Sequence, residues 1–244
     1  MPISVLVNGA FGKMGLMVAK ALEEDDRFEL VGQTNREYDL GKSINDSQPQ
    51  VVIDFTNPES VFDNAMTIID AGAHPVIGTT GLLEGQIQTL QKKAMDKKLG
   101  GIIAPNFSIG ANLLIKYAKE IARHMKHLEI IEMHHDQKVD SPSGTAIRTA
   151  EQIAAVQKDL NKSEKNYHET IPGARGAVYQ NIPIHAIRLP GLLAHQQVIF
   201  GGLGETLTLR HDAMDRLCFL PGIFYACQKV LELDRLVYGL EEII

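Results

Sequence analysis

Cysteine is scarce in this chain of 244 residues, which contains only Cys218 and Cys227. So few thiols argue against a disulfide framework and against a zinc cluster, both of which need more of them. The two cysteines lie in an apparently helical, apolar segment. We therefore expect two buried thiols that act as small hydrophobic side chains.

Positive charge is also in short supply, since 24 Lys and Arg stand against 30 Asp and Glu, for a formal net charge of −6. Binding to nucleic-acid phosphates needs a dense basic surface, so we expect no nucleic-acid partner. Long apolar runs are missing as well. The longest segment without a charged residue, 99–115, is interrupted by a proline, a glycine and polar residues, which makes it a poor membrane span.

The first residues, 1–9, enter a strand pattern at once and lack the charged start, apolar stretch and cleavage site of a secretory signal. We therefore expect a cytoplasmic protein with no membrane partner. The composition, 44% hydrophobic and 22% charged, is that of an ordinary globular protein. The length favours two modest domains.

Short apolar runs alternate with helical patterns over the first 105 residues. The runs expected to form strands are 3–7, 28–34, 51–55, 75–78 and 101–104. Between two of them, Asn57-Pro58 predicts a helix start, with the proline at the first helical position, and Gly72 predicts its end. This alternation predicts an α/β, Rossmann-type domain with helices on both faces of a parallel sheet.

The pattern changes after residue 105. A helix at about 112–125, a strand at 128–134, a helix from about Thr145 and a hairpin of strands near 197–200 and 207–210 predict a mixed α+β domain. A last helical stretch should begin at Asp212 or Ala213. The polar segment 161–170 should be a surface loop.

The segment Val7 to Gly15, V-N-G-A-F-G-K-M-G, places Gly9, Gly12 and Gly15 between an expected strand and an expected helix. The spacing G-x-x-G-x-x-G differs from the common G-x-G-x-x-G, and Phe11 stands where many such loops have a second glycine. A strand before, a helix after and a further strand ending about twenty residues later favour a nicotinamide dinucleotide site. An ordinary turn is the alternative.

Asn35 and Arg36 stand at the strand end where an acidic residue would repel a 2′-phosphate. Together with Lys13, Arg36 could pair with that phosphate, so we expect NADPH to be accepted, with NADH left open. The alternative is that both cations are merely solvated. The segments 78–81 and 104–108 each follow an expected strand, and they are either nicotinamide-side contacts or simple turns.

The stretch 132–146, E-M-H-H-D-Q-K-V-D-S-P-S-G-T-A, concentrates ionisable groups. His134 and His135 are adjacent on or just after a strand, so they point to opposite faces and we expect no metal site. Lys138 and one histidine could supply a proton, and the helix start at 143–145 could hold a carboxylate. A solvated loop is the alternative.

Five motifs, in this order, resemble the 4-hydroxy-tetrahydrodipicolinate reductase family, formerly called dihydrodipicolinate reductase. They are V-N-G-A-F-G-K-M-G at 7–15, D-F-T at 54–56, G-T-T-G at 78–81, P-N-F-S at 105–108 and the stretch 132–146. The resemblance implies reduction of a cyclic six-carbon dicarboxylate to tetrahydrodipicolinate, with hydride from NADPH or NADH and loss of water, in the diaminopimelate route to lysine.

The resemblance also implies roles for individual residues. His134 looks like a proton donor or acceptor and Lys138 like a proton donor, which makes both catalytic candidates. The implied substrate contacts are His135, Ser143, Gly144 and Thr145. The implied cofactor contacts are Gly9, Ala10, Phe11, Gly12, Lys13, Met14, Asn35, Arg36, Gly78, Thr79, Thr80, Ala104, Pro105, Asn106 and Phe107.

The family fold implies a dinucleotide-binding domain at 1–105, to which the last helices at about 213–244 return, and a substrate-binding and oligomerisation domain at 106–212. It also implies a homotetramer through a shared sheet. The short segment between Arg36 and Val51 implies that a helix of longer members is missing, and Asp54 should have a structural or adenosine-side role. Rival readings are another dehydrogenase of this layout, and a nucleotide sensor that would not depend on Lys138.

Overall fold

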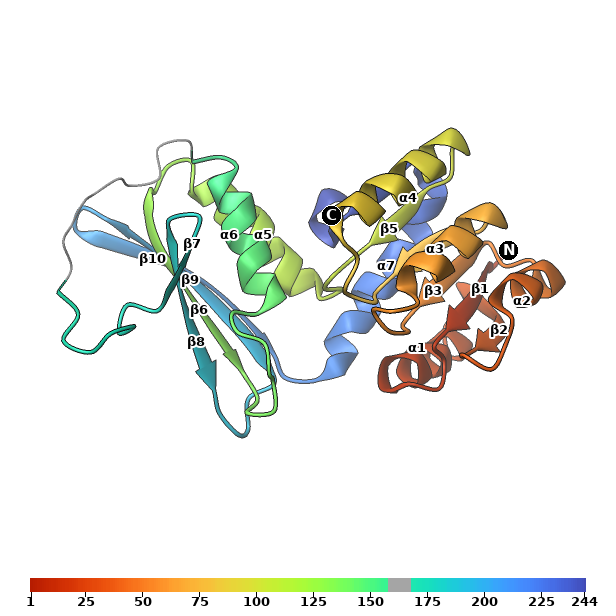
Figure 1. The fold of residues 1–244 in the computed structure, drawn as a ribbon, viewed down its shortest axis with the longest axis horizontal. Coiled ribbons are helices and arrows are strands. Elements are labelled where there is room, and N and C mark those ends of the chain that lie inside the picture. The colour runs from red at the N-terminus through yellow and green to blue at the C-terminus, as the bar shows by residue number, and fades with distance from the viewer. Residues whose placement is uncertain (158–167) are drawn as a thin grey trace. The chain divides into compact units, whose positions relative to one another are not determined.

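The computed structural model describes residues 1–157 and 168–244, so most of the predicted loop at 161–170 lies outside the described residues. The chain divides into two compact units (Figure 1). The first comprises Met1–Phe107 together with Phe219–Ile244, and the second comprises Ser108–Cys218. The chain therefore leaves the first unit once and returns to it at its end.

The first unit is built on a six-stranded sheet in the order β11-β5-β4-β3-β1-β2, and every neighbouring pair is parallel. The predicted Rossmann-type α/β fold is confirmed. The elements are β1 (Ile3–Asn8), α1 (Lys13–Glu23), β2 (Phe28–Thr34), α2 (Leu40–Ser47), β3 (Val51–Asp54), α3 (Val61–Asp70), β4 (His74–Ile77), α4 (Glu84–Asp96), β5 (Gly101–Ile103), α7 (Leu220–Lys229), β11 (Leu236–Tyr238) and two 3-10 helices, η2 (Val230–Glu232) and η3 (Leu240–Glu242).

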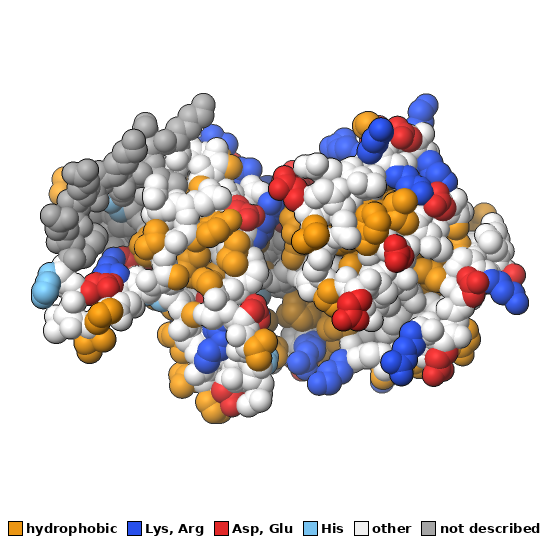
Figure 2. Space-filling view, in the orientation of Figure 1, with side chains coloured by type: hydrophobic (Ala, Val, Ile, Leu, Met, Phe, Trp, Pro, Cys, Tyr) orange, Lys and Arg blue, Asp and Glu red, His pale blue; other side chains and the backbone are white. Residues whose placement is uncertain are grey.

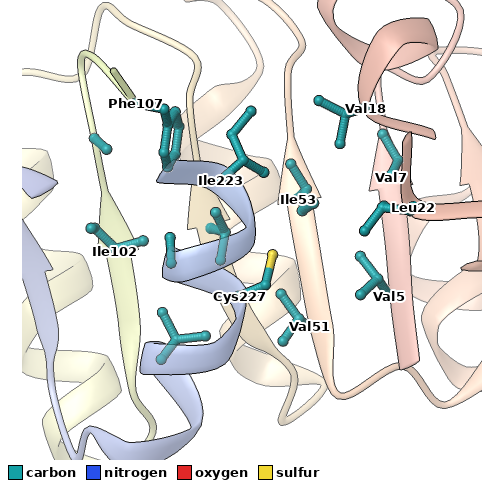
Figure 3. Packing of buried hydrophobic residues seen from close by; sticks show 14 of the residues in the cluster. Val5, Val7, Val18, Leu22, Val51, Ile53, Ile102, Phe107, Ile223 and Cys227 are labelled. Atoms are coloured by element: carbon teal, nitrogen blue, oxygen red, sulfur yellow. The ribbon is translucent and has the colours of Figure 1, made fainter. Parts of the chain in front are cut away.

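Helices cover both faces of this sheet, as buried parallel strands require. In β1, Val5 and Val7 pack toward α1 and α7, whereas Leu6 between them packs toward α2, α3 and α4. Figure 3 shows Ile223 and Cys227 of α7 facing the strands of the first of these two cores. The alternation of side chains along each strand therefore fills two separate apolar layers.

The strand order reverses beside β1, because β2 lies on one side of β1 and β3 on the other. Ligands of such sheets bind outside the carboxyl ends of the strands at this point. The glycine-rich turn follows β1 there. The segments after β3, β4 and β5 leave from the same edge of the sheet.

Two predictions for the first unit were wrong, and one strand had been missed. A helix is present between Arg36 and Val51, because Asp39 accepts a hydrogen bond from the backbone N–H of Lys42 (2.9 Å) and α2 buries Ile44. Pro58 lies in a turn rather than at the first position of α3, which begins at Val61. The strand β11 had not been predicted; its three residues pair with β5.

The second unit carries a five-stranded sheet in the order β10-β9-β6-β8-β7, in which only β6 and β8 are parallel. The predicted α+β character is confirmed. Its elements are α5 (Ile109–Ile121), β6 (His127–His134), α6 (Gly144–Ala154), β7 (Ala177–Tyr179), β8 (Ile182–Arg188), β9 (Ala194–Gly202), β10 (Glu205–Ala213) and a 3-10 helix, η1 (Arg216–Phe219), whose last residue belongs to the first unit.

One face of this sheet packs against α5 and α6 around a core that includes Ile130, Val198 and Phe200. The predicted helix start at Asp212 or Ala213 was wrong. Both residues belong to β10, where Asp212 accepts a hydrogen bond from His195 Nδ1 (2.7 Å) on β9, and the next α-helix begins only at Leu220.

Of the two cysteines, Cys227 is buried in the core of the first unit, as predicted, and burial raises the pKa of its thiol. Cys218, at the end of the second unit, is only partly buried, so the prediction was wrong for that residue.

In the part of the chain that the structure describes, no helix combines the length and apolarity needed to cross a bilayer. Figure 2 shows Lys and Arg side chains mixed with Asp and Glu over the visible face of the first unit. That face therefore carries no continuous basic surface.

Candidate active site

The glycine-rich turn after β1 needs glycine at two positions for reasons internal to the chain. Gly9 has φ +79°, and a Cβ atom added there would lie 2.3 Å from the carbonyl oxygen of Phe55. A Cβ on Gly15 would lie 2.1 Å from the carbonyl oxygen of Gly9. The first turn of α1 thus packs directly on the turn that precedes it.

Gly12 is the N-cap residue of α1 and has no side chain with which to cap the helix. The N–H groups of the first turn point out of the helix, where the helix dipole favours negative charge. This turn, at the reversal point of the sheet, fits the pyrophosphate of a dinucleotide. Phe11, between the first two glycines, is 52% exposed.

Asp54, at the end of β3, ties together the segments that border this edge. Its fully buried carboxylate accepts hydrogen bonds from Asn8 Nδ2 (2.8 Å), Asn64 Nδ2 (2.9 Å), Thr56 Oγ1 (2.7 Å) and Thr79 Oγ1 (2.6 Å). Asp54 therefore has a structural role, and the hydroxyl of Thr79 is engaged with it.

Aromatic packing explains Gly78. The rings of Phe55 and Phe107 meet edge to face with centroids 6.0 Å apart, and a Cβ on Gly78 would lie 2.1 Å from the Phe55 ring. Of the predicted cofactor contacts in these segments, Thr79, Ala104 and Phe107 are buried, Gly78 and Asn106 are partly buried, and Thr80 and Pro105 are exposed.

The predicted adenosine-side residues lie at the end of β2 and the start of α1. Asn35 Oδ1 accepts a hydrogen bond from the backbone N–H of Glu37 (2.8 Å), which shapes the turn that carries Arg36. The side chains of Arg36 and Lys13 are both exposed. Ala10 is buried, whereas the side chain of Met14 is only partly buried.

In the second unit, the strand β6 ends in a carboxylate and a histidine on one face. Glu132 is fully buried, and its Oε2 lies 2.6 Å from His134 Nδ1. Arg188, beside His134 on β8, donates to both oxygens of Glu132 at 2.8 Å. Burial acts to raise the pKa of Glu132, but the hydrogen bonds of His134 and Arg188 outweigh it and lower the pKa to about 2.

The loop after β6 carries the lysine. Lys138 Nζ donates to Asp140 Oδ1 (2.7 Å) and Oδ2 (2.8 Å). The hydrogen bond from Lys138 lowers the pKa of Asp140. His135, at the start of this loop, is partly buried, and its carbonyl oxygen accepts a hydrogen bond from the N–H of Lys138 (3.2 Å). A paired ammonium group that is 21% exposed can still meet a ligand.

The helix α6 begins where the loop ends. Ser143 is its N-cap, and its hydroxyl accepts a hydrogen bond from the N–H of Ala146 (3.2 Å). Its own N–H donates to Glu132 Oε1 (3.1 Å). A Cβ on Gly144 would meet no atom within 4 Å, so there is open space beside the first helical residue, and Thr145 next to it is partly buried.

The structure brings Ser143 and His134 to the same carboxylate. Reasoning from the sequence assigned no role to Glu132, Asp140 or Arg188. The spacing of Glu132 and His134, two residues apart on a strand, was a usable signal, since such residues share a face. No sequence signal near Arg188 links it to Glu132, 56 positions earlier.

Among residues 1–157 and 168–244, no cluster of three or more His, Cys, Asp or Glu could hold a metal ion.

Comparisons with known proteins cover both units. The family model "Dihydrodipicolinate reductase, N-terminus" matches residues 3–107, and "Dihydrodipicolinate reductase, C-terminus" matches residues 110–244. The chain is 55% identical over 244 residues to 4-hydroxy-tetrahydrodipicolinate reductase of Coxiella burnetii (strain RSA 493 / Nine Mile phase I), with 100% of both chains covered. It is 52% identical over 240 residues to the enzyme of that name from Legionella pneumophila (strain Paris), with 98% of each covered.

Solved structures agree with these matches. The dipicolinate-bound dihydrodipicolinate reductase from Paenisporosarcina sp. TG-14 has a TM-score of 0.91 and 41% identity, with 100% of each chain covered. GenD2 from gentamicin A biosynthesis, in complex with NAD, has a TM-score of 0.65 at 13% identity, over 95% of this chain and 86% of that one, and shares the fold alone. Because the two family models match residues 3–107 and 110–244, and relatives above half identity cover 98–100% of the chain, this protein belongs to the dihydrodipicolinate reductase family.

Proposed function

We propose that this protein reduces 4-hydroxy-tetrahydrodipicolinate to tetrahydrodipicolinate, with hydride from NADPH or NADH and loss of water, in lysine biosynthesis through diaminopimelate. The observation that carries the proposal is the buried carboxylate of Glu132, which binds both His134 and the N-cap of α6 in a chain whose relatives have this activity by name. A cytoplasmic location fits that biosynthetic role.

The substrate is a dicarboxylate, and the second unit offers positive electrostatic potential for it. Gly144 leaves open space at the N-terminus of α6, where N–H groups and the helix dipole favour a carboxylate. The ammonium group of Lys138, on the loop that leads into α6, is a further positive charge proposed to bind the substrate. The side chains of His135 and Thr145 complete the proposed substrate contacts.

The reaction consumes a reduced nicotinamide and one proton and releases water. Bound NADPH or NADH supplies the hydride. Departure of the 4-hydroxyl as water takes up a proton, and a neighbouring ring carbon loses one in the same dehydration. Hydride addition to one ring carbon is then balanced by protonation of a neighbouring atom, which consumes the one net proton. We assign these proton transfers to His134 and Lys138, because imidazole and ammonium groups exchange protons near neutral pH when positioned at a substrate.

The test is oxidation of NADPH and NADH in a mixture of aspartate semialdehyde, pyruvate and the preceding synthase, which generates the substrate in place. Lys138→Ala should lower kcat by about a hundred- to ten-thousand-fold, since it removes a proton donor. Cofactor affinity should stay unchanged. Lys92→Ala, which removes an exposed lysine from α4, is the matched control and should keep full activity.

Two outcomes would contradict the proposal. If the coupled mixture gave no oxidation although NAD(P)H binding was demonstrated, a nucleotide sensor or a dehydrogenase for another substrate would be favoured. If Lys138→Ala lost cofactor binding to the same degree as turnover, the lysine would have a structural role instead.

The cofactor proposal is that Arg36, with Lys13, binds the 2′-phosphate of NADPH, so that NADPH is accepted as well as NADH. Arg36→Ala should weaken NADPH binding by about tenfold, the effect of losing one charged hydrogen bond, and leave NADH binding unchanged. Lys20→Ala, at a 77% exposed side chain on α1, is the control. Equal NADPH and NADH affinities in Arg36→Ala and in the parent would refute this role.

We also propose a homotetramer. The sheet of the second unit packs α5 and α6 on one face, whereas the other face presents Ile131, Met133 and Ile199 in partly buried positions. A second copy of the same sheet would cover these apolar side chains. Light scattering after size exclusion should give four times the mass of one chain, and Met133→Asp should lower it.

A further inference from the structure

The carboxylate of Glu132 connects three separate elements of the second unit. Its Oε2 is bound to His134 Nδ1 (2.6 Å) on β6 and Arg188 Nη1 (2.8 Å) on β8. Its Oε1 is bound to Arg188 Nη2 (2.8 Å) and to the N–H of Ser143 (3.1 Å) at the start of α6. A fully buried carboxylate with four donors has no oxygen lone pair directed at solvent.

The arrangement fixes which ring nitrogen of His134 carries the proton. An ionised carboxylate can only accept, and Arg188 donates to both of its oxygens, so His134 Nδ1 has to donate. In the neutral imidazole the lone pair then lies on Nε2. The histidine is 14% exposed, which leaves Nε2 as its proton-exchanging atom.

Arg188 extends this arrangement to the loop that carries Lys138. Its Nη2 also donates to the carbonyl oxygen of Asp140 (2.8 Å), whose side chain binds Lys138. The loop is therefore held at Asp140 by Arg188 and at Ser143 by Glu132. The ionisable groups of this network are Glu132 and His134 on β6, Arg188 on β8, and Lys138 and Asp140 on the loop.

We infer that Glu132 and Arg188 are positioning residues of the active site, which hold His134 as the Nδ1–H tautomer and keep it in register with the substrate-binding start of α6. Neither is assigned contact with the substrate. This inference rests on the proposed function for its catalytic consequence, but the tautomer it demands is a property of the protein alone.

Glu132→Gln is the most informative variant, because it keeps the shape of the side chain and removes its negative charge. The amide oxygen is drawn to Arg188 and the Ser143 N–H, which leaves the amide NH₂ directed at His134 Nδ1. Nδ1 must then accept, and the proton moves to Nε2. The expected result is a change from the Nδ1–H to the Nε2–H tautomer of His134, observed by long-range ¹H–¹⁵N NMR of the imidazole ring.

The turnover rate should depend on the tautomer of His134. Glu132→Gln should lower kcat by roughly a hundredfold, since the neutral ring no longer accepts a proton at Nε2, while KM for NADPH stays near the parental value. Arg188→Lys keeps the positive charge but cannot donate two parallel hydrogen bonds, so it should show a smaller loss in the same direction.

Two control variants distinguish this positioning role from a general loss of structure in the second unit. Glu129→Gln alters another carboxylate–histidine pair, between Glu129 on β6 and His185 on β8, and should leave the His134 signals unchanged. Glu151→Gln removes a partly exposed carboxylate from α6 and should leave kcat within about twofold of the parent.

The wild-type spectrum is decisive even if Glu132→Gln does not fold. A neutral His134 with its proton on Nε2 would overturn the inference, as would Glu132→Gln with an unchanged tautomer and kcat within about twofold of the parent. Absence of coupled activity in the wild type would refute the proposed function instead, while the tautomer would still test the positioning role.

Discussion

Glu132 shows how one buried residue links stability to pH. Its pKa falls from the ordinary 4.5 to about 2 in the folded protein, because the hydrogen bonds of His134 and Arg188 outweigh the effect of burial. A lowered folded pKa means that the stabilising contribution is complete above pH 4.5 and is lost as the pH falls toward 2. This shift of the Glu132 pKa corresponds to a contribution of about 3 kcal/mol to the free energy of unfolding.

We therefore expect the parent to unfold at progressively lower urea concentrations as the pH falls from 4.5 toward 2. Glu132→Gln, which has no proton to take up at this position, should be less stable than the parent above this pH range and lose less stability within it. The same pH dependence in both proteins would mean that other carboxylates dominate acid unfolding.

At the scale of single residues, part of the candidate site could be predicted from the sequence. His134, Lys138 and Ser143 were selected because a histidine, an ammonium group and a helix start together suit proton transfer to an anion. Glu132 could have been selected too, from its spacing to His134 on a strand. Arg188 could not, because its place beside His134 depends on the parallel register of β6 and β8.

The helix α6 begins with a side-chain cap. Ser143 is buried, and its hydroxyl accepts a hydrogen bond from the N–H of Ala146. Ser143→Ala should lower the free energy of unfolding by about 1–2 kcal/mol, measured by chemical denaturation. Ser47→Ala, in the last turn of α2, removes a hydroxyl that donates to the Ser43 carbonyl within the same helix and should cost less than about 0.5 kcal/mol. Equal losses would mean that the cap contributes nothing special.

The elements that were predicted correctly have strong local patterns. The runs that form β1 and β3 are largely apolar and fully or largely buried, and Gly72, with φ +80°, ends α3 as expected. The failures have physical reasons. The helix α2 is polar and buries a single residue, Ile44, while β11 has only three residues. Asp212 and Ala213 are strand residues because of cross-strand partners that no local pattern reveals.

At the scale of the whole molecule, the first unit is incomplete without the end of the chain. Ile223, Ala226 and Cys227 of α7 are buried in the same cluster as β1 and β3, and β11 pairs with β5. A fragment of residues 1–107 should therefore show no cooperative thermal unfolding by circular dichroism. A chain that joins 1–107 to 219–244 through a short Gly/Ser linker should regain it.

The joined chain is feasible because the two segments already touch. A Cβ on Gly222 would lie 1.9 Å from the carbonyl oxygen of Phe107, so the start of α7 lies against the end of the first segment. Cooperative unfolding of 1–107 alone would show that α7 and β11 are dispensable. Resemblance to a family implied the return of the chain, whereas no composition or spacing within 219–244 does so.

This discontinuity has a consequence for synthesis. As the chain leaves the ribosome, β5 is made before the whole of Ser108–Cys218, and its neighbour β11 is made only after it. The second unit, which is continuous in sequence, has all of its strands available while the first still exposes the edge of β5 and the apolar surface that α7 will cover. The half of the protein that is translated first is thus the half that is completed last.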